Sequence, residues 1–216
     1  MASDPVAEGF VASFNRPGGN MTGITSIGGS LAPKRLDLMR GFLHDDAVMA
    51  ILINPSNPLA AAERKDTEAA ARAIGQRLEV LTANNVGEID QAFASLKQRG
   101  VGALIIAADI FYYGQMQRLA TLAAQQAMPA MGPRRDFPAE GGLLSYGASI
   151  LEVNRQSGIL AGKVLKGARP AELPVRQPTK FELGSRLIKS TIQGLLRDRQ
   201  QPSNFAPACH SALRCA

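Results

Sequence analysis

The strongest constraint on the fold is the stretch Gly102–Met131, which reads as a strand, a turn, a helix and a second strand. Leu104–Ala107 is a continuous apolar run, as is typical of a strand buried on both faces of a parallel sheet. Apolar residues then recur at helical spacing over 116–124. In open parallel sheets ligands bind beyond the carboxyl ends of strands, which is where Asp109 and Phe111 lie in this βαβ unit.

The same alternation of buried strand and amphipathic helix runs along most of the chain. Further strands are predicted at 22–27, 48–53, 78–82, 127–132, 143–146 and 180–183, and further helices from Pro5 and at 31–43, 59–77, 88–99, 150–166 and 186–197. Right-handed crossovers between parallel strands place helices on both faces of a sheet. The sequence therefore predicts an α/β fold with a doubly wound parallel sheet.

The net charge of +6 lies mostly at the C-terminal end of the chain. Residues 1–175 hold 17 basic and 16 acidic side chains, so the folded body offers no general field for a polyanion and no nucleic-acid partner is expected. No segment reaches the roughly 18 consecutive apolar residues of a membrane span. The first ten residues lack the basic and apolar regions of a signal peptide, so the chain as written is expected to be cytoplasmic.

Motifs that would bind a cofactor or a metal ion are not found in the sequence. Phosphate groups need a glycine-rich loop such as GxGxxG or GxxxxGKS at a helix start, and neither pattern occurs. The histidines, His44 and His210, do not belong to a cluster with metal-ligand spacing. We therefore expect no cofactor, no metal site and no catalytic residue.

Polar or aromatic residues do recur just beyond the predicted strands. They include Ser26, Asn84 and the segment 134–136. Side-chain amides, a carboxylate and aromatic faces suit hydrogen bonding and stacking to a small polar or zwitterionic molecule. The candidate ligand-binding residues are Asn54, Asn57, Asp109, Phe111, Asp136 and Tyr146.

Three stretches of the sequence resemble a known family over roughly residues 3–185. They are DPVAEGFVASFNRPGGNMTGIT, LINPSNP and YGASILEVNRQSGILAGKVLKGARPAELPVRQPTKFEL, and the segment GGLLSYG at 141–147 adds a fourth match. These stretches resemble the substrate-binding proteins of a bacterial ABC-transporter family. The resemblance implies a type I periplasmic-binding-protein fold, in which two α/β lobes joined by a hinge close on a small ligand, and some relatives bind amino acids. It also implies a periplasmic location and an ABC permease as partner.

Two departures from that family shape the expected domain organisation. The export signal and the first-lobe sheet are missing, so the chain is expected to be truncated at its N-terminus. After KFEL the family continues with a sequence similar to NLKTAKALGL, whereas this chain reads GSRLIKSTIQ, for which we hypothesise a frameshift. The expected parts are a first-lobe remnant at 1–22, the second lobe at 23–148, a helix returning to the first-lobe side at 149–170, a closing strand and helix at 171–197, and an irregular tail at 198–216.

A chain with only one complete lobe would expose apolar surface, which favours self-association, and would bind its ligand weakly or not at all. The alternative to a solute-binding protein is a stand-alone flavodoxin-like enzyme, in which Asp109 would have to act chemically. A second alternative is the ligand-sensing domain of a transcription regulator.

Overall fold

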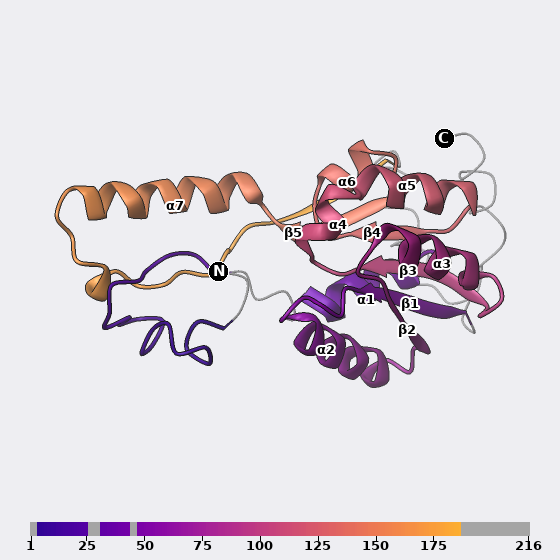
Figure 1. Ribbon diagram of the computed structural model, residues 1–216, viewed down its shortest axis with the longest axis horizontal. Coiled ribbons are helices and arrows are strands. Elements are labelled where there is room, and N and C mark those ends of the chain that lie inside the picture. The colour runs from indigo at the N-terminus through magenta and orange to yellow at the C-terminus, as the bar shows by residue number, and fades with distance from the viewer. Residues whose placement is uncertain (1–3, 26–30, 44–46, 187–216) are drawn as a thin grey trace, which may run out of the picture. The chain divides into compact units, whose positions relative to one another are not determined.

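The computed structural model describes residues 4–25, 31–43 and 47–186, which divide into two compact units (Figure 1). The first unit contains the described residues of 1–30 and 147–182. The second contains the described residues of 31–146 and those from 183 onward. Which segment belongs to which lobe of a two-lobed protein stays a prediction.

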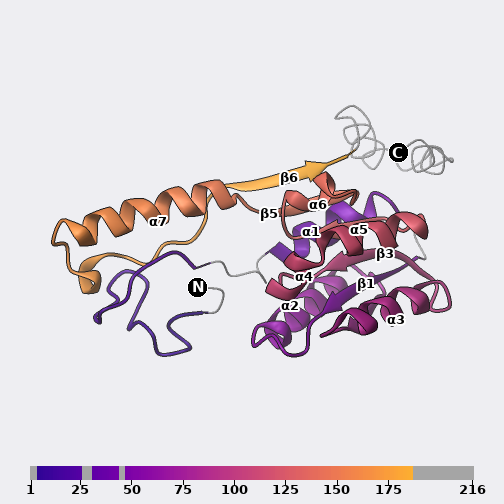
Figure 2. The same cartoon turned by 45° about the horizontal axis from the view of Figure 1, so that its top comes forward.

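The strands form one six-stranded sheet in the order β2-β1-β3-β4-β5-β6. Their bounds are β1 Val48–Ile53, β2 Leu78–Thr82, β3 Val101–Ile106, β4 Ala130–Gly132, β5 Leu144–Ala148 and β6 Phe181–Ser185. The pairs from β2 to β5 are all parallel. The edge strand β6, orange in Figure 2, runs antiparallel to β5, because Ser149 N–H donates to the carbonyl of Lys180 while Arg186 N–H donates to that of Leu143.

Helices cover both faces of this sheet, which confirms the predicted doubly wound α/β fold. Their bounds are α1 Ala32–Arg40, α2 Ala60–Ala73, α3 Val86–Leu96, α4 Ile110–Gly114, α5 Met116–Gln125 and α6 Asp136–Ala139. A further helix, α7 Ile150–Leu165, belongs to the first unit. Alternate residues of β1 and β3 belong to two different apolar clusters, since successive side chains of a strand point to opposite faces. One cluster includes the buried residues of α3 and α5, and the other those of α1 and Ala71 of α2.

The first unit is built from α7 and the irregular segments at 4–25 and 166–180. Ile24 forms an isolated parallel bridge with Arg176, and Val175 N–H donates to the carbonyl of Phe14. The buried apolar residues of this unit are few, and α7 contributes only Leu160. Backbone hydrogen bonds between irregular segments therefore contribute much of its order.

The predicted helix from Pro5 is wrong. The segment makes one irregular turn, in which Asp4 Oδ1 accepts from Val6 N–H and Phe10 N–H donates to the carbonyl of Pro5. Gly9 then adopts a φ of 72°, a left-handed conformation that ends the turn before a helix can propagate.

Other element predictions need smaller corrections. The predicted strand at 22–27 contributes only the bridge at Ile24 within its described part, and Ser26 lies outside the described residues. The helix predicted at 186–197 and the tail at 198–216 also lie outside them, apart from Arg186. The single helix expected after Asp109 is two helices, α4 and α5, which meet at Gln115.

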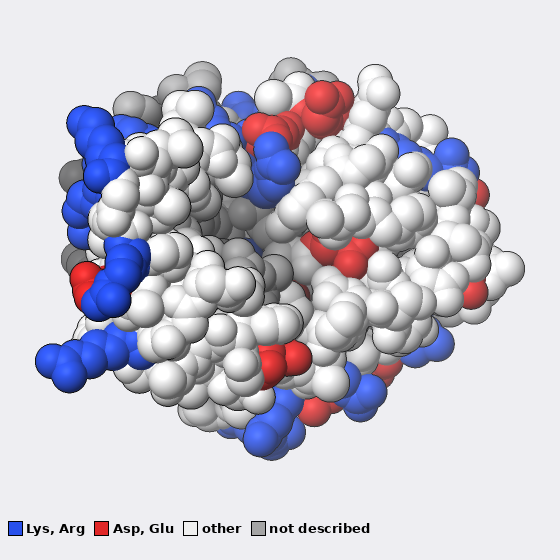
Figure 3. Space-filling model, turned by 60° about the vertical axis from the view of Figure 1, so that its left-hand side comes forward, with Lys and Arg blue, Asp and Glu red and all other residues white. Residues whose placement is uncertain are grey.

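No helix in the described part of the chain has the length and apolar character needed to cross a membrane. On the face shown in Figure 3, Lys and Arg side chains are interspersed with uncharged residues. The positive charge of the described residues on that face is therefore dispersed.

Candidate functional site

Asp109 is the centre of a hydrogen-bonded cluster at the carboxyl end of β3. Its backbone is extended and its side chain caps α4, because Oδ1 accepts from the backbone N–H groups of Phe111 at 2.9 Å and Tyr112 at 3.3 Å. Such capping satisfies amide groups that have no partner inside the helix. The position of this carboxylate is thus set by the strand that precedes it and the helix that follows it.

Two asparagines that follow β1 donate to the same carboxylate. Asn54 Nδ2 lies 3.0 Å from Oδ1 of Asp109, and Asn57 Nδ2 lies 2.9 Å from its Oδ2. The side-chain oxygens of both asparagines accept from backbone N–H groups two residues ahead, those of Ser56 and Leu59. These local turns leave the side-chain NH₂ groups to point toward Asp109. The structure therefore brings together three of the predicted site residues.

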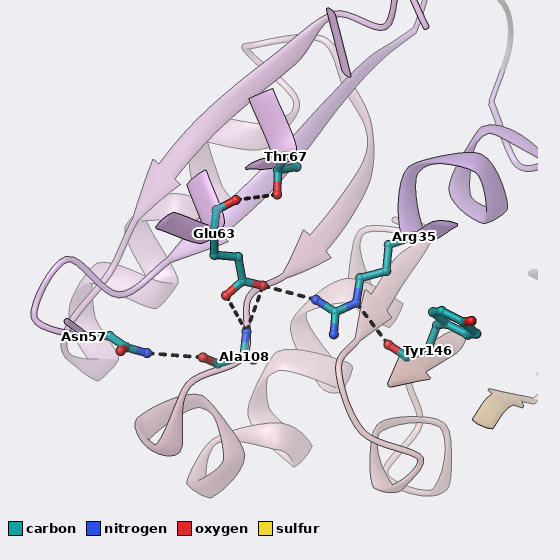
Figure 4. A network of polar contacts seen from close by, with 6 residues as sticks. All are labelled: Arg35, Asn57, Glu63, Thr67, Ala108 and Tyr146. Carbon is teal, nitrogen blue, oxygen red and sulfur yellow. Dashed lines mark hydrogen bonds and ion pairs between the residues drawn. The ribbon is translucent and has the colours of Figure 1, made fainter. Parts of the chain in front are cut away.

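A buried ion pair lies beside this cluster (Figure 4). Arg35 of α1 donates from Nη1 to Oε1 of Glu63 of α2 at 3.1 Å, and the two side chains are only 5% and 8% exposed. Glu63 also accepts from the backbone N–H of Ala108, one residue before Asp109. Arg35 Nε donates to the carbonyl of Tyr146 at 3.0 Å. The pair thus fixes the backbone just after β3 and in the middle of β5, next to the candidate residues Asp109 and Tyr146.

Burial shifts the pKa of both members of this pair. Loss of solvent raises the pKa of Glu63, and the charge of Arg35 and the N–H of Ala108 oppose that shift. Loss of solvent likewise lowers the pKa of Arg35, and the charge of Glu63 opposes it. Each of the two side chains, Arg35 and Glu63, therefore depends on the charge of the other to stay ionised in the protein interior.

The remaining predicted residues are more dispersed. The Phe111 ring lies 5.7 Å from that of Tyr112, centroid to centroid, and the Tyr112 hydroxyl donates to the carbonyl of Ala83. Asp136 begins α6 and pairs with Arg134 at 2.5 Å. Tyr146 is half-buried on β5. The described contacts do not join Asp136 directly to Asp109.

Sequence reasoning missed Arg35, Glu63 and Tyr113. A signal was present for the first two, because Arg35 lies next to Leu36 on the apolar stripe of its helix, and Glu63, Thr67 and Ala71 share the buried stripe of theirs. A charge on each of two buried stripes predicts a pair. Tyr113 gave no comparable signal, since it stands directly after another tyrosine.

Tyr113 occupies a charged environment. The centre of the Arg134 guanidinium lies 5.1 Å from the centroid of its ring, within the range of a cation–π contact. Burial raises the pKa of the Tyr113 hydroxyl, and the positive charges of Arg35 and Arg134 act in the opposite direction. Tyr113 is therefore close to the charged groups that follow β3 and β4.

The described residues include no group of three or more His, Cys, Asp or Glu side chains placed to hold a metal ion. What the cluster does offer is a fixed carboxylate, donating amides, aromatic rings and a guanidinium. These groups suit recognition of a small polar molecule by hydrogen bonds and charge.

Comparison with protein families identifies the chain. The family described as ABC transporter substrate binding protein matches residues 1–189. The chain belongs to this family. The resemblance seen in the sequence is thereby confirmed, and the family is one of substrate-binding proteins.

One curated relative is a tyrosine-binding protein of Clostridioides difficile (strain R20291). It is 24% identical over 181 residues, which are 84% of this chain and 52% of that protein. The chain thus spans about half the length of the curated relative that it matches.

Solved structures share the fold at low identity. A domain of an ABC protein from Streptococcus pneumoniae in complex with L-Trp has a TM-score of 0.74 and 21% identity, covering 89% of this chain and 64% of that one. A conserved domain protein from Vibrio cholerae has a TM-score of 0.75 and 19% identity, covering 97% and 67%. A LacI family regulator from Bifidobacterium animalis has a TM-score of 0.61 and 13% identity, covering 76% and 62%. These likenesses establish the fold.

Proposed function

We propose that this chain is part of the solute-binding component of an ABC importer and binds a small amino-acid-like ligand. The ligand would contact the carboxyl edge of the parallel sheet, at Asn54, Asn57, Asp109, Phe111, Asp136 and Tyr146. The observation that carries this proposal is the Asp109 carboxylate, held by both asparagine amides and by the first N–H groups of α4.

The chemistry of this edge supports an amino-acid-like ligand. A carboxylate fixed before the ligand arrives attracts an ammonium group without loss of side-chain freedom on binding. Phe111 is only partly buried and supplies apolar surface next to it. The printed names of two relatives, a tyrosine-binding protein and a complex with L-Trp, support the same ligand class.

The proposal includes a second lobe as the other half of the ligand site. In this view the unit that contains most of the sheet is one lobe, and the unit with α7 is part of the other. Ligand binding would close the two lobes, and the permease would recognise the closed form in the periplasm.

A titration of the ¹⁵N-labelled chain with L-tryptophan and L-tyrosine, followed by NMR, tests this function because it detects weak binding. We expect shifts at the residues following β1 and β3, and tighter binding by a version extended with the first lobe of a relative. Asn57→Ala should weaken binding. Asn84→Ala is the matched control, since Asn84 also follows a strand but is exposed. Binding of neither amino acid by either version, or turnover of either one, would contradict the proposal.

Exposed apolar side chains also support self-association between copies of this chain. Phe10 is 48% exposed, and Leu151 and Leu165 of α7 are 66% and 88% exposed. Exposed apolar side chains of this size favour contact with a second apolar surface. Sedimentation velocity should show concentration-dependent association that decreases in a Leu151→Ser/Leu165→Ser variant, and a monomer at all concentrations would refute it.

A further inference from the structure

Arg134 lies just beyond the carboxyl end of β4, next to the strand that leads to Asp109. Its Nη2 lies 2.5 Å from Oδ2 of Asp136, and its guanidinium carbon lies 5.1 Å from the Tyr113 ring centroid. Its Nε is buried and has no hydrogen-bond partner among the described residues. A buried N–H donor of this kind costs free energy unless another group accepts a hydrogen bond from it.

The geometry of the guanidinium group shows which partner would fit. The Nε–H and one Nη2–H point in parallel from the same edge, so that together they match the two oxygens of one carboxylate. Asp136 occupies only the Nη2 arm of this fork. The Arg134 guanidinium lies over the Tyr113 ring, and this contact limits the freedom of the arginine side chain before a ligand binds.

We propose that Arg134 binds the carboxylate of the ligand through Nε and Nη2, and that Asp136 occupies the Nη2 arm when no ligand is bound. This inference rests on the proposed solute-binding function and adds the orientation of the ligand. The ligand class is a zwitterionic amino acid whose carboxylate faces the end of β4 and whose ammonium group faces Asp109 at the end of β3. Asp136, proposed above to lie at the ligand, therefore competes with the ligand carboxylate for Arg134.

The spacing of Asp109 and Arg134, which follow neighbouring strands, suits a molecule as small as an amino acid. β3 and β4 are adjacent parallel strands, and neighbouring strands lie about 4.8 Å apart. Tyr113 links the two ends, because its backbone N–H donates to the carbonyl of Asp109 at 3.0 Å while its ring contacts Arg134. Oδ2 of Asp109 accepts from Asn57 among the contacts described, which leaves capacity for an ammonium N–H.

The test compares L-tryptophan with tryptamine, which lacks the carboxylate, by NMR titration of the full chain and its variants. Arg134→Met should weaken L-tryptophan binding about tenfold or more and leave tryptamine binding unchanged, because a charged bidentate contact is lost. Arg134→Lys keeps the charge but not the fork, and it should also lose most of the affinity for L-tryptophan. Asp136→Asn should tighten L-tryptophan binding, since the competitor loses its charge.

The matched control is the pair Arg118 and Asp90, another Arg–Asp contact of 2.5 Å, in which Arg118→Met and Asp90→Asn should leave both affinities unchanged. Equal L-tryptophan affinity in the native chain and in Arg134→Met would overturn the inference while leaving the proposed function intact. Equal weakening of tryptamine and L-tryptophan by Arg134→Met would also overturn it. If neither the native chain nor the version extended with the first lobe binds L-tryptophan or tryptamine, the proposed function fails and this inference fails with it.

Discussion

At the scale of single residues, the pair of Arg35 and Glu63 decides how firmly the site is held. Neither side chain contacts the proposed ligand, yet their bonds reach the backbone of Ala108 and Tyr146. A buried pair of charges adds little net stability by itself, because desolvation offsets most of the attraction. Its value lies in fixing the backbone next to Asp109 and Tyr146.

Arg35→Met should therefore be far more damaging than removal of both charges. The single variant leaves the Glu63 carboxylate buried without its cation, which costs about 3–5 kcal/mol, whereas Arg35→Met/Glu63→Leu replaces both by apolar groups and recovers much of that loss. Urea denaturation followed by circular dichroism gives the free energy of unfolding of each variant. If the loss in free energy of unfolding of the double variant equals the sum of the losses of the two single variants, Arg35 and Glu63 are not coupled, and the contact seen in the structure would be contradicted.

The raised pKa of Glu63 predicts a pH dependence of stability. Because the folded state holds the Glu63 proton more tightly than the unfolded chain, the contribution of Glu63 is fully present below the unfolded pKa, and it is lost as the pH rises through the folded pKa. The free energy of unfolding of the native chain, minus that of Glu63→Gln, should thus decrease as the pH rises from about 4 toward 8. A difference that increases over this range would show that the pKa is lowered instead.

At the scale of elements, the sequence predicted most of the sheet, and the misses have local causes. β1 and β3 appear where apolar runs predicted them, because a strand buried on both faces needs such a run. The helix from Pro5 failed because its hydrophobic spacing had no packed face to stabilise it and Gly9 ended the turn. The break between α4 and α5 follows Gly114, a residue that disfavours a helix interior, so a local signal for it was present in the sequence.

The loop and helix that carry Asp136 depend on two glycines. Phe137 of α6 is fully buried, and a Cβ added at Gly132 would lie 2.6 Å from its Cγ, while one added at Gly142 would overlap the same ring. Gly132→Ala should therefore lower the free energy of unfolding by about 1–3 kcal/mol through overpacking. Combining it with Phe137→Leu should relieve part of that loss.

Gly158→Ala is the control for this substitution. Gly158 lies in the middle of α7, and a Cβ added there would meet no atom within 4 Å. Because alanine stabilises a helix interior more than glycine does, the free energy of unfolding of this variant should exceed that of the native chain by about 0.5–1 kcal/mol. Thermal unfolding of both alanine variants, measured side by side, should show opposite shifts, and equal shifts would contradict the packing described for Phe137.

At the scale of the whole molecule, the sequence predicted which candidate residues lie together only where backbone direction decides their position. Asn54, Asn57 and Asp109 follow neighbouring parallel strands, so their meeting could be predicted from topology alone. The ion pair of Arg35 and Glu63 and the contact of Arg134 with Tyr113 depend on how helices pack across the sheet ends. Packing of this kind involves residues distant in the sequence: local patterns place Arg35 and Glu63 on buried helix stripes, but they do not encode the contact of Arg134 with Tyr113.

The two units should differ in local stability, because their apolar cores differ. The second unit has two clusters of buried side chains on opposite faces of its sheet, whereas the buried apolar residues described in the first are Val11, Ile24, Leu160 and Val175. Segments with few buried contacts open at low free-energy cost, so their amide hydrogens exchange quickly. Hydrogen exchange measured by mass spectrometry should show faster exchange in α7 than in β1 and β3. Protection of α7 equal to that of β1 would mean that another surface covers it in solution, and the exchange of a Leu151→Ser/Leu165→Ser variant would then show whether that surface is a second copy.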